Sequence, residues 1–176
     1  MIQTTDGTRT EPIPYRSLAQ GFAALRVLMG LVWLSNGLAK VTGVGAVDWG
    51  FFSFNLITRG TAQGIATDAA SKTQIAPLGA FYRDVVLSNW GVFGVLLTVA
   101  ELAVGVGLLL GIATRLAAVG GLLLIAPIWI MLWHTTGYLW EYPLDLFPLV
   151  LLAIVPAGRV FGVDRTIAAR FNHWPF

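Results

Sequence analysis

Residues 101–118 read ELAVGVGLLLGIATRLAA, and this stretch decides the class of fold. Glu101 heads a run of apolar residues and glycines that closes only at Arg115, and the apolar run extends back to Trp90. Such a run is typical of a helix inside a lipid bilayer, where an unpaired charge costs at least about 2.5 kcal/mol. The stretch therefore predicts that Glu101 has a partner, or a proton, within the membrane.

The composition of the whole chain agrees with a membrane protein. Of the 176 residues, 56% are hydrophobic and only 11% are charged, whereas about a quarter of the residues of a soluble domain are charged. A membrane helix needs about 20 apolar residues and satisfies its own backbone hydrogen bonds. The sequence predicts one all-α membrane domain over residues 1–176, a four-helix bundle with transmembrane helices at about 18–39, 90–112, 116–133 and 138–157.

The basic residues predict how these helices are oriented. Short segments rich in arginine favour the cytoplasmic side of a membrane, and long loops weigh less. We expect both tails, 1–17 and 158–176, to be cytoplasmic in a multi-pass protein of the cell (inner or plasma) membrane, with the loop 40–89 outside. The first seventeen residues are polar, so we expect no cleaved signal peptide. The arginines behind this orientation are Arg9, Arg16, Arg115, Arg159, Arg165 and Arg170.

Several classes of function are disfavoured by the composition. The formal charge of +2 is small and scattered, so we expect no nucleic acid partner. The absence of cysteine removes disulfides, thiolate metal sites and iron–sulfur ligation. The two histidines, His134 and His173, fall on opposite faces of the predicted membrane. We therefore expect no metal or haem on this chain.

The loop 40–89 has two contrasting parts. Its first part, VDWGFFSFNLITRG at 47–60, carries four aromatic residues, which predict a segment in the lipid headgroup layer. Its middle, TAQGIATDAASKTQ at 61–74, is small and polar and predicts a short helix. Ser88 or Asn89 is the expected N-cap of the helix that follows.

Charged residues within the first predicted helix offer a partner for Glu101. Arg26 and Lys40 share one face of that helix, with two glycines between them that allow a neighbouring helix to approach. At 1.5 Å per residue, Arg26 lies about 12 Å and Glu101 about 15 Å from the predicted cytoplasmic surface. These depths predict an Arg26–Glu101 ion pair, while a protonated Glu101 bonded to a neighbour is the alternative. Whether such a pair is a structural clamp or a functional one stays open.

A second group of polar residues is expected near the outer face. Glu141 and Asp145 are four residues apart and share a face of the last helix, which indicates a polar or water-filled pocket. The alternative is an ordinary interfacial belt whose charged ends reach water. The other members of this group are Asn36, Lys40, His134 and Tyr138.

Several stretches of the chain resemble the DoxX family. These are LRVLMGLVWLSNGLAKV at 25–41, the opening stretch at 101–118, and AGRVFGVDRTIA at 157–168. WGFFSFNLITRG and FYRDVVLSNWGVFGVLLT in and after the loop resemble its DoxD branch, which includes the integral membrane subunit of thiosulfate:quinone oxidoreductase. The resemblance runs from about Ser17 to Ala169. It implies a four-helix membrane protein that works with partner subunits in sulfur or redox metabolism and passes electrons to quinone. The matching polar positions are Arg26, Lys40, Glu101 and Arg115.

With that resemblance, the first functional hypothesis is a membrane subunit of a quinone-linked oxidoreductase. It would oxidise thiosulfate or a related small sulfur anion, attracted by basic residues of the outer side. Glu101 and Asp145 are the candidate catalytic residues, moving the protons that accompany quinone reduction. Because the chain has no electron carrier of its own, a partner subunit supplies one or substrate and quinone react directly. The candidate substrate- or quinone-binding residues are Arg26, Asn36, Lys40, Arg59, Arg83, His134, Tyr138 and Glu141.

The second hypothesis is not enzymatic. Glycine-rich helices allow close packing, so the chain could be an accessory or anchor subunit that contacts lipid and partner proteins within a larger membrane complex. Gly105, Gly107, Gly120 and Gly121 would then be core or interface positions. A transporter is less favoured, since four helices without inverted repeats suit alternating access poorly.

Overall fold

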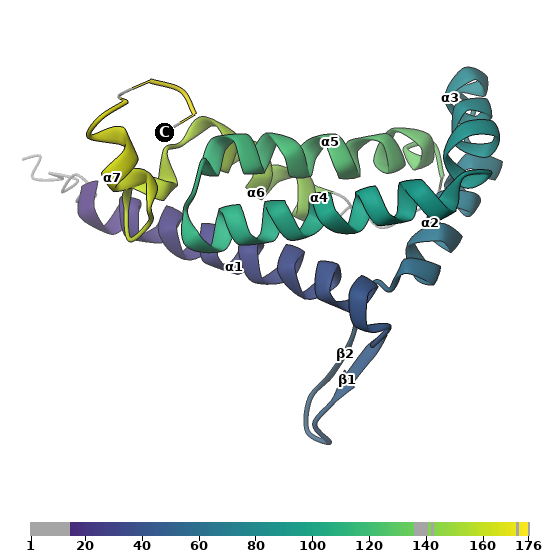
Figure 1. Ribbon diagram of the computed structural model, residues 1–176, viewed down its shortest axis with the longest axis horizontal. Helices are drawn as coiled ribbons and strands as arrows, with labels where there is room; N and C mark the ends of the chain where they lie inside the picture. Colours follow the sequence, from purple (N-terminus) through teal and green to yellow (C-terminus); the bar gives the residue numbers. More distant parts are fainter. Residues whose placement is uncertain (1–14, 136–140, 142, 172, 176) are drawn as a thin grey trace, which may run out of the picture.

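Three long apolar helices form the body of the molecule (Figure 1). The computed structural model describes residues 15–135, 141, 143–171 and 173–175. Within them, α1 (Tyr15–Thr42), α4 (Trp90–Leu110) and α5 (Thr114–Leu132) are each long and apolar enough to cross a membrane. This result confirms the mostly helical fold, and three helices that could cross a membrane agree with the membrane character that the composition predicts.

The fourth predicted span is shorter in the structure than in the prediction. Its described part forms α6 (Pro143–Ile154), an apolar helix of 12 residues. At 1.5 Å per residue it is about 18 Å long, less than the roughly 30 Å of a bilayer core. The start of the predicted span, residues 138–140 and 142, lies outside the described residues. A bundle of four complete spans therefore stays a prediction.

The segment between α1 and α4 is more structured than a loop. The predicted short helix is confirmed as α2 (Arg59–Lys72), and α3 (Ala76–Phe81) and a π-helix, η1 (Tyr82–Leu87), follow it. The aromatic part forms a two-stranded antiparallel hairpin, β1 (Ala46–Asp48) and β2 (Ser53–Asn55), so the all-α prediction is wrong at this point. Asn89 is the N-cap residue of α4 as predicted, but its amide donates to Val85 O instead of capping the helix.

Glycines set the register between α1 and α4, which pack together more extensively than any other pair of helices. Gly30 lies against the backbone of Leu109, and Gly105 lies against the backbone of Leu34. A Cβ added at Gly30 or Gly105 would approach a backbone nitrogen to 2.6 or 2.5 Å, respectively. Helices without side chains at their crossing points can approach this closely. The two contacts together fix how far one helix slides along the other.

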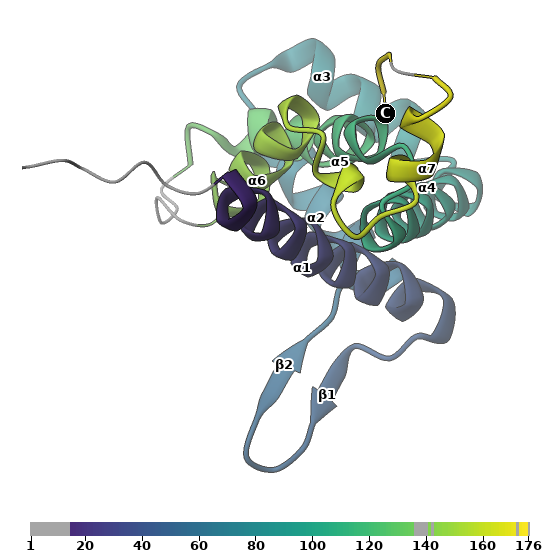
Figure 2. The ribbon, with the colours of Figure 1, turned by 90° about the vertical axis from the view of Figure 1, so that its left-hand side faces the viewer.

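The four helices form two pairs that share a core. α1 packs on α4 and α5 packs on α6, and Figure 2 views the bundle from one end. A tight turn joins the pairs, with Gly111 at φ 68° and Ala113 at φ 46°. Residues from all four helices then close the core, namely Met29, Val104, Leu108, Ala118, Leu149 and Leu152.

The C-terminal segment closes the end of the molecule where α4 meets α5, here called the α7 end. It contains a 3-10 turn, η2 (Ala157–Arg159), and α7 (Asp164–Ala168). The buried Asp164 carboxylate accepts hydrogen bonds from Ala113 N at 2.6 Å and Thr114 N at 2.9 Å. A carboxylate at a helix N-terminus satisfies free backbone N–H groups and favours the helix dipole. Asp164 therefore caps α5 from a distant part of the sequence.

Arg26 belongs to this end of the molecule, so the predicted Arg26–Glu101 pair is wrong. Its guanidinium, 1% exposed, donates to Leu108 O at 2.6 Å, Leu109 O at 3.1 Å and Phe161 O at 3.3 Å. The depth estimate failed because helix ends do not mark equal depths when two helices slide past one another. The glycine register puts Arg26 beside the last carbonyls of α4, which it satisfies in place of a C-cap side chain.

The glycine register gives a first testable prediction. Gly105→Ala should lower the free energy of unfolding by about 1–3 kcal/mol, because the methyl group would push the Leu34 backbone away. Gly120→Ala is the matched control, since its Cβ would meet only Val104 Cγ2, at 3.5 Å. That control should be neutral or gain up to about 1 kcal/mol of helix propensity. Thermal unfolding of the purified protein in detergent, followed by circular dichroism, measures both; equal stability of Gly105→Ala and the control would contradict the register.

Candidate functional site

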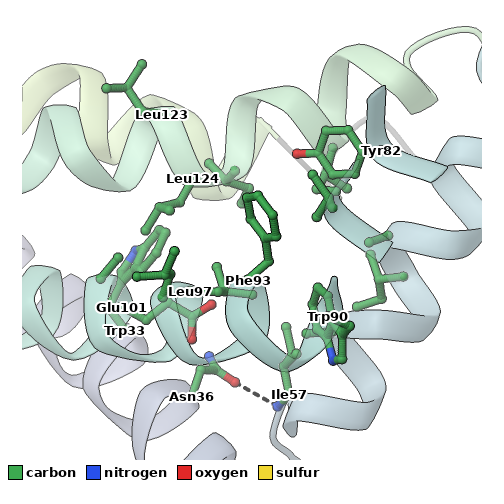
Figure 3. A pocket seen from close by; sticks show the side chains of 18 of the residues that line it. Trp33, Asn36, Ile57, Tyr82, Trp90, Phe93, Leu97, Glu101, Leu123 and Leu124 are labelled. Carbon is green, nitrogen blue, oxygen red and sulfur yellow. Dashed lines mark hydrogen bonds between the residues drawn. The ribbon is translucent and has the colours of Figure 1, made fainter. Parts of the chain in front are cut away.

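A cavity of about 550 Å³ lies between the two helix pairs, towards the end opposite α7, here called the α2 end. Side chains from α1, α4, α5 and α6 line it, and α2 and η1 contribute further residues (Figure 3). The wall is mostly apolar and aromatic, with Phe81, Trp90, Phe93, Leu97, Leu124 and Ile128 among its residues. A cavity of this size is typical of sites for small organic ligands.

The polar groups of the cavity come from separate elements. Asn36 and Trp33 lie on α1, Tyr82 begins η1, Glu101 lies on α4, and Asp145 lies in the first turn of α6. The sequence predicted Asn36, Glu101 and Asp145 as site residues, and the structure brings these three to one cavity. It also adds Trp33 and Tyr82 to the cavity wall.

The orientation of Asn36 is fixed by two hydrogen bonds to the backbone. Its Oδ1 accepts from Ile57 N at 2.8 Å, and its Nδ2 donates to Val32 O at 3.0 Å (Figure 3 draws the former). Since a primary amide has two N–H groups, one donor of Asn36 is left over for a ligand. The bond to Ile57 also ties the end of the hairpin segment to α1.

Glu101 is held by Lys40 in a buried ion pair. Lys40 Nζ lies 2.7 Å from Glu101 Oε2, and the two side chains are 1% and 12% exposed. Lys40 Nζ also donates to Ile57 O at 3.0 Å. The ion pair neutralises Glu101 without a proton, which a lone buried carboxylate would need. Lys40 is thus the cation that the opening stretch of sequence required, and it lies in the last turn of α1, whereas Arg26 lies near the middle of that helix.

Asp145 differs from Glu101 because it has no such partner. Within the described part of the chain, it forms no ion pair and no hydrogen bond, and its side chain is half-buried in the cavity wall. Because Asp145 lies in the first turn of α6, its negative charge is stabilised only by the positive end of the helix dipole. Of the two cavity carboxylates, Asp145 is the one free to exchange a proton or to bond a ligand.

The predicted arginines do not line the cavity. Arg59 donates to Trp90 O at 3.2 Å and Gly91 O at 2.8 Å, and Arg83 donates to Ala70 O at 2.7 Å. Both arginines therefore join the helices of the α2 end. Arg26, at the α7 end, lies far from the site.

The remaining predicted residues also lie apart from the cavity. Lys40 is not part of the wall and contacts two residues that are, Glu101 and Ile57. His134 and Glu141 are absent from its wall, and Glu141 is exposed. Tyr138 lies outside the described residues.

Part of the aromatic wall follows a helical pattern in the sequence. Trp90, Phe93, Leu97 and Glu101 follow one another at spacings of three, four and four, which place them on one face of α4. That face points into the cavity. Tyr82 has no comparable signal, since it lies in a π-helix that only the structure reveals.

Tyr82 adds a hydroxyl to the cavity. Burial raises the pKa of this phenol above its ordinary value, because the charged form is disfavoured away from water. The hydroxyl is therefore protonated at neutral pH and available as a hydrogen-bond donor.

These groups define what the cavity can hold. Donors from Asn36, Tyr82 and the Trp33 indole, together with the Asp145 carboxylate, suit a flat ring with polar substituents in an otherwise apolar wall. The described residues contain no group of three or more histidine, cysteine, aspartate or glutamate side chains that could hold a metal ion.

The fold and the cavity together define a helical protein with membrane-length helices and a ligand-sized apolar site. Comparison with protein-family models, with characterised proteins and with solved structures finds no match to the chain. The likeness to the DoxX family therefore remains a resemblance carried by the residues quoted above.

The Lys40–Glu101 pair generates the second prediction. Lys40→Met or Glu101→Leu alone should cost about 3–5 kcal/mol of unfolding free energy, because each leaves a buried charge unpaired. The double variant Lys40→Met/Glu101→Leu should recover most of that loss, since neither charge remains. Unfolding in mixed detergent micelles measures the three variants. If the two single losses simply added in the double variant, the pair would have no energetic coupling and the assignment would fail.

Proposed function

We propose that this chain is the membrane subunit of a quinone-linked oxidoreductase, and that its cavity holds the quinone ring. The observation that supports this most directly is the cavity itself, an aromatic and apolar site of about 550 Å³ between membrane-length helices. A quinone needs a flat apolar slot and donors for its two carbonyl oxygens. Asn36, Tyr82 and Trp33 offer such donors from three directions around the wall.

The opening of the cavity fits a ligand that lives in the bilayer. Leu96 and Leu123 line the cavity and are also largely exposed on the surface of the long helices. In a membrane this surface meets lipid chains. A ring in the cavity would leave its isoprenoid tail to extend between these residues into the bilayer.

The proposal assigns separate roles to the two carboxylates. Reduction of a quinone to a quinol takes up two electrons and two protons, and Asp145 is the group that delivers protons to the ring oxygens. Glu101 stays ionised against Lys40 and fixes the electrostatic potential of the cavity. This division narrows the prediction from sequence, which gave both acids a catalytic role.

The electrons, in this proposal, come from a small sulfur anion such as thiosulfate. Its oxidation takes place on a partner subunit that carries the electrons to the quinone, or at the cavity mouth by direct reaction. The charges of Arg59 and Arg83 at the α2 end would draw such an anion towards that end. The proposed orientation has the α2 end outside and both termini in the cytoplasm of a cell membrane, supported by Arg16, Arg115 and Arg165 at the α7 end.

The alternative, a purely structural accessory subunit, is less well supported by the structure than by the sequence. Its sequence evidence was the set of glycines on the second and third helices. In the structure, Gly105 packs on Leu34, Gly107 on Ala117, and Gly121 on Leu149 and Trp33, all within the chain. These three glycines serve the internal packing of the protein, while Gly120, the fourth, is half-buried and would meet only Val104 Cγ2 at 3.5 Å.

Filling the cavity tests whether it is the binding site. Ala100 lines the cavity, while its neighbour Val99 is 59% exposed on the outer surface of α4. Ala100→Phe should weaken binding of a short-chain quinone at least tenfold, equivalent to about 1.4 kcal/mol, and Val99→Phe should leave it unchanged. Quenching of tryptophan fluorescence in lipid nanodiscs measures both affinities. Equal affinities of the two variants would place the quinone elsewhere or nowhere on this chain.

Neutralising Asp145 tests the proton-transfer role. Asp145→Asn should retain quinone affinity and thermal stability but slow thiosulfate-dependent quinone reduction in native membranes by about 10²–10⁴-fold, the usual contribution of a general acid. Asp145→Glu, which keeps the titratable group, should restore part of the rate. Full activity of Asp145→Asn would remove Asp145 from the mechanism.

A further inference from the structure

The hairpin formed by residues 46–55, here called the aromatic hairpin, is well defined by its own backbone bonds. Ala46 pairs with Asn55 and Asp48 with Ser53, and Trp49 N donates to Phe52 O at 3.0 Å across the turn. Gly50 has φ 79°, a left-handed conformation that favours glycine, and its N–H donates to Asp48 Oδ1 at 2.8 Å. Gly50 and Asp48 therefore favour the turn that this hairpin needs.

The aromatic side chains of the hairpin gather without a protein surface to cover them. Ring centroids lie 6.3 Å apart for Trp49–Phe52, 6.0 Å for Trp49–Phe54 and 5.6 Å for Phe52–Phe54. Their residues remain 61%, 54% and 37% exposed, and Phe51 at the turn is 90% exposed. An isolated two-stranded hairpin is only marginally stable in water. Something outside the described chain must therefore cover these rings.

The position of the hairpin indicates what covers it. α1 ends at Thr42, four residues before the first strand. Both ribbon views show the hairpin projecting sideways from that end of α1, across the direction of the long helices. If the long helices span a membrane, a segment at this place and in this direction runs along the membrane surface.

Two constraints fix its depth. Aromatic rings favour the boundary between lipid chains and water. The strands are only three residues long and each leaves one edge unpaired, which the hydrocarbon core does not tolerate in contact with lipid. The rings disfavour water and the unpaired backbone disfavours hydrocarbon. Both conditions are met in the headgroup layer.

We propose that the aromatic hairpin is a lateral arm that lies in the lipid headgroup layer and anchors the α2 end of the protein at the membrane surface. Its partner is the lipid interface. The segment from Val41 to Thr58 carries a single charged residue, Asp48, and no lysine or arginine. Unlike a polybasic anchor, which needs anionic lipid, this arm works by burying aromatic rings. The proposal is independent of whether the cavity binds a quinone.

The hairpin is nevertheless connected to the cavity wall through hydrogen bonds at its base. Leu56 N donates to Gly45 O at 2.9 Å at the base of the hairpin, and the next residue, Ile57, bonds both Asn36 and Lys40. Ile57 is also part of the cavity wall. A hairpin held in the headgroup layer therefore fixes the level at which the polar end of the cavity lies.

The absence of cysteine from the chain allows a direct measurement of depth. Phe51→Cys introduces one thiol at the most exposed ring of the hairpin, and a nitroxide label there reports its access to oxygen, which concentrates in lipid, and to a water-soluble nickel chelate. The full-length protein is reconstituted in phosphatidylcholine vesicles. Val99→Cys on the exposed face of α4 serves as the deep reference, and Lys72→Cys, in an exposed ion pair with Asp68, as the aqueous one.

The expected result is a Phe51→Cys label about 5–10 Å below the lipid–water boundary, between the two references. Replacing a third of the lipid with phosphatidylglycerol should leave this depth unchanged. A label as accessible to nickel as Lys72→Cys would overturn the proposal. So would strong dipolar broadening between labels, which would show that a second copy of the chain covers the hairpin, or a depth that appears only with anionic lipid.

Discussion

The contact between α1 and α4 is the constraint on which the rest of the structure depends. Gly30 and Gly105 let the two backbones meet at two points, and two such points leave no freedom for one helix to slide along the other. Lys40 then reaches Glu101, and Arg26 reaches the last carbonyls of α4. Each charge of α1 thus finds its partner because small residues set the register. A shift of one turn, about 5.4 Å, would leave both cations unsatisfied in the interior.

The cavity follows from a difference between the two ends of the bundle. At the α7 end, Gly107 packs on Ala117, and Gly158 and Gly162 bring the C-terminal segment against Thr114 and Gly111. At the α2 end, large side chains including Trp90 and Phe93 line the space between the pairs. Helices that are drawn together by small residues at one end and held apart by aromatic residues at the other enclose a space. The aromatic residues that line this cavity are thus part of its architecture as well as of its surface.

The sequence predicts this fold unevenly, for physical reasons that differ from one element to the next. Three membrane-length helices and α2 follow from hydropathy and composition, which are local properties. The partner of Glu101 could not be predicted in this way, because it depends on how far α1 and α4 are shifted along each other. These helices are distant in the sequence: α1 ends at Thr42 and α4 begins 48 residues later, at Trp90. The capping role of Asp164 could not be predicted from local sequence either, since the helix that it caps begins fifty residues earlier, at Thr114. The hairpin was not predicted: its aromatic residues led to the prediction of a segment in the headgroup layer, which stays a prediction, and no strands were assigned to it.

The site was predictable to the extent that polar residues in an apolar helix are rare and therefore conspicuous. Asn36, Glu101 and Asp145 stood out for this reason, and all three line the cavity. The arginines stood out equally, yet they bond backbone carbonyls at helix ends and junctions. An arginine can satisfy several carbonyls at once through its planar fork of donors, so it suits a structural role that a carboxylate cannot fill. A carboxylate in the same setting has no backbone N–H to bond in the middle of a helix. Glu101, in the middle of α4, therefore pairs with a cation. Asp164 accepts backbone N–H groups at the start of α5, while Asp145, in the first turn of α6, forms no ion pair or hydrogen bond among the described residues. The position of a carboxylate along a helix thus decides which partners it can find.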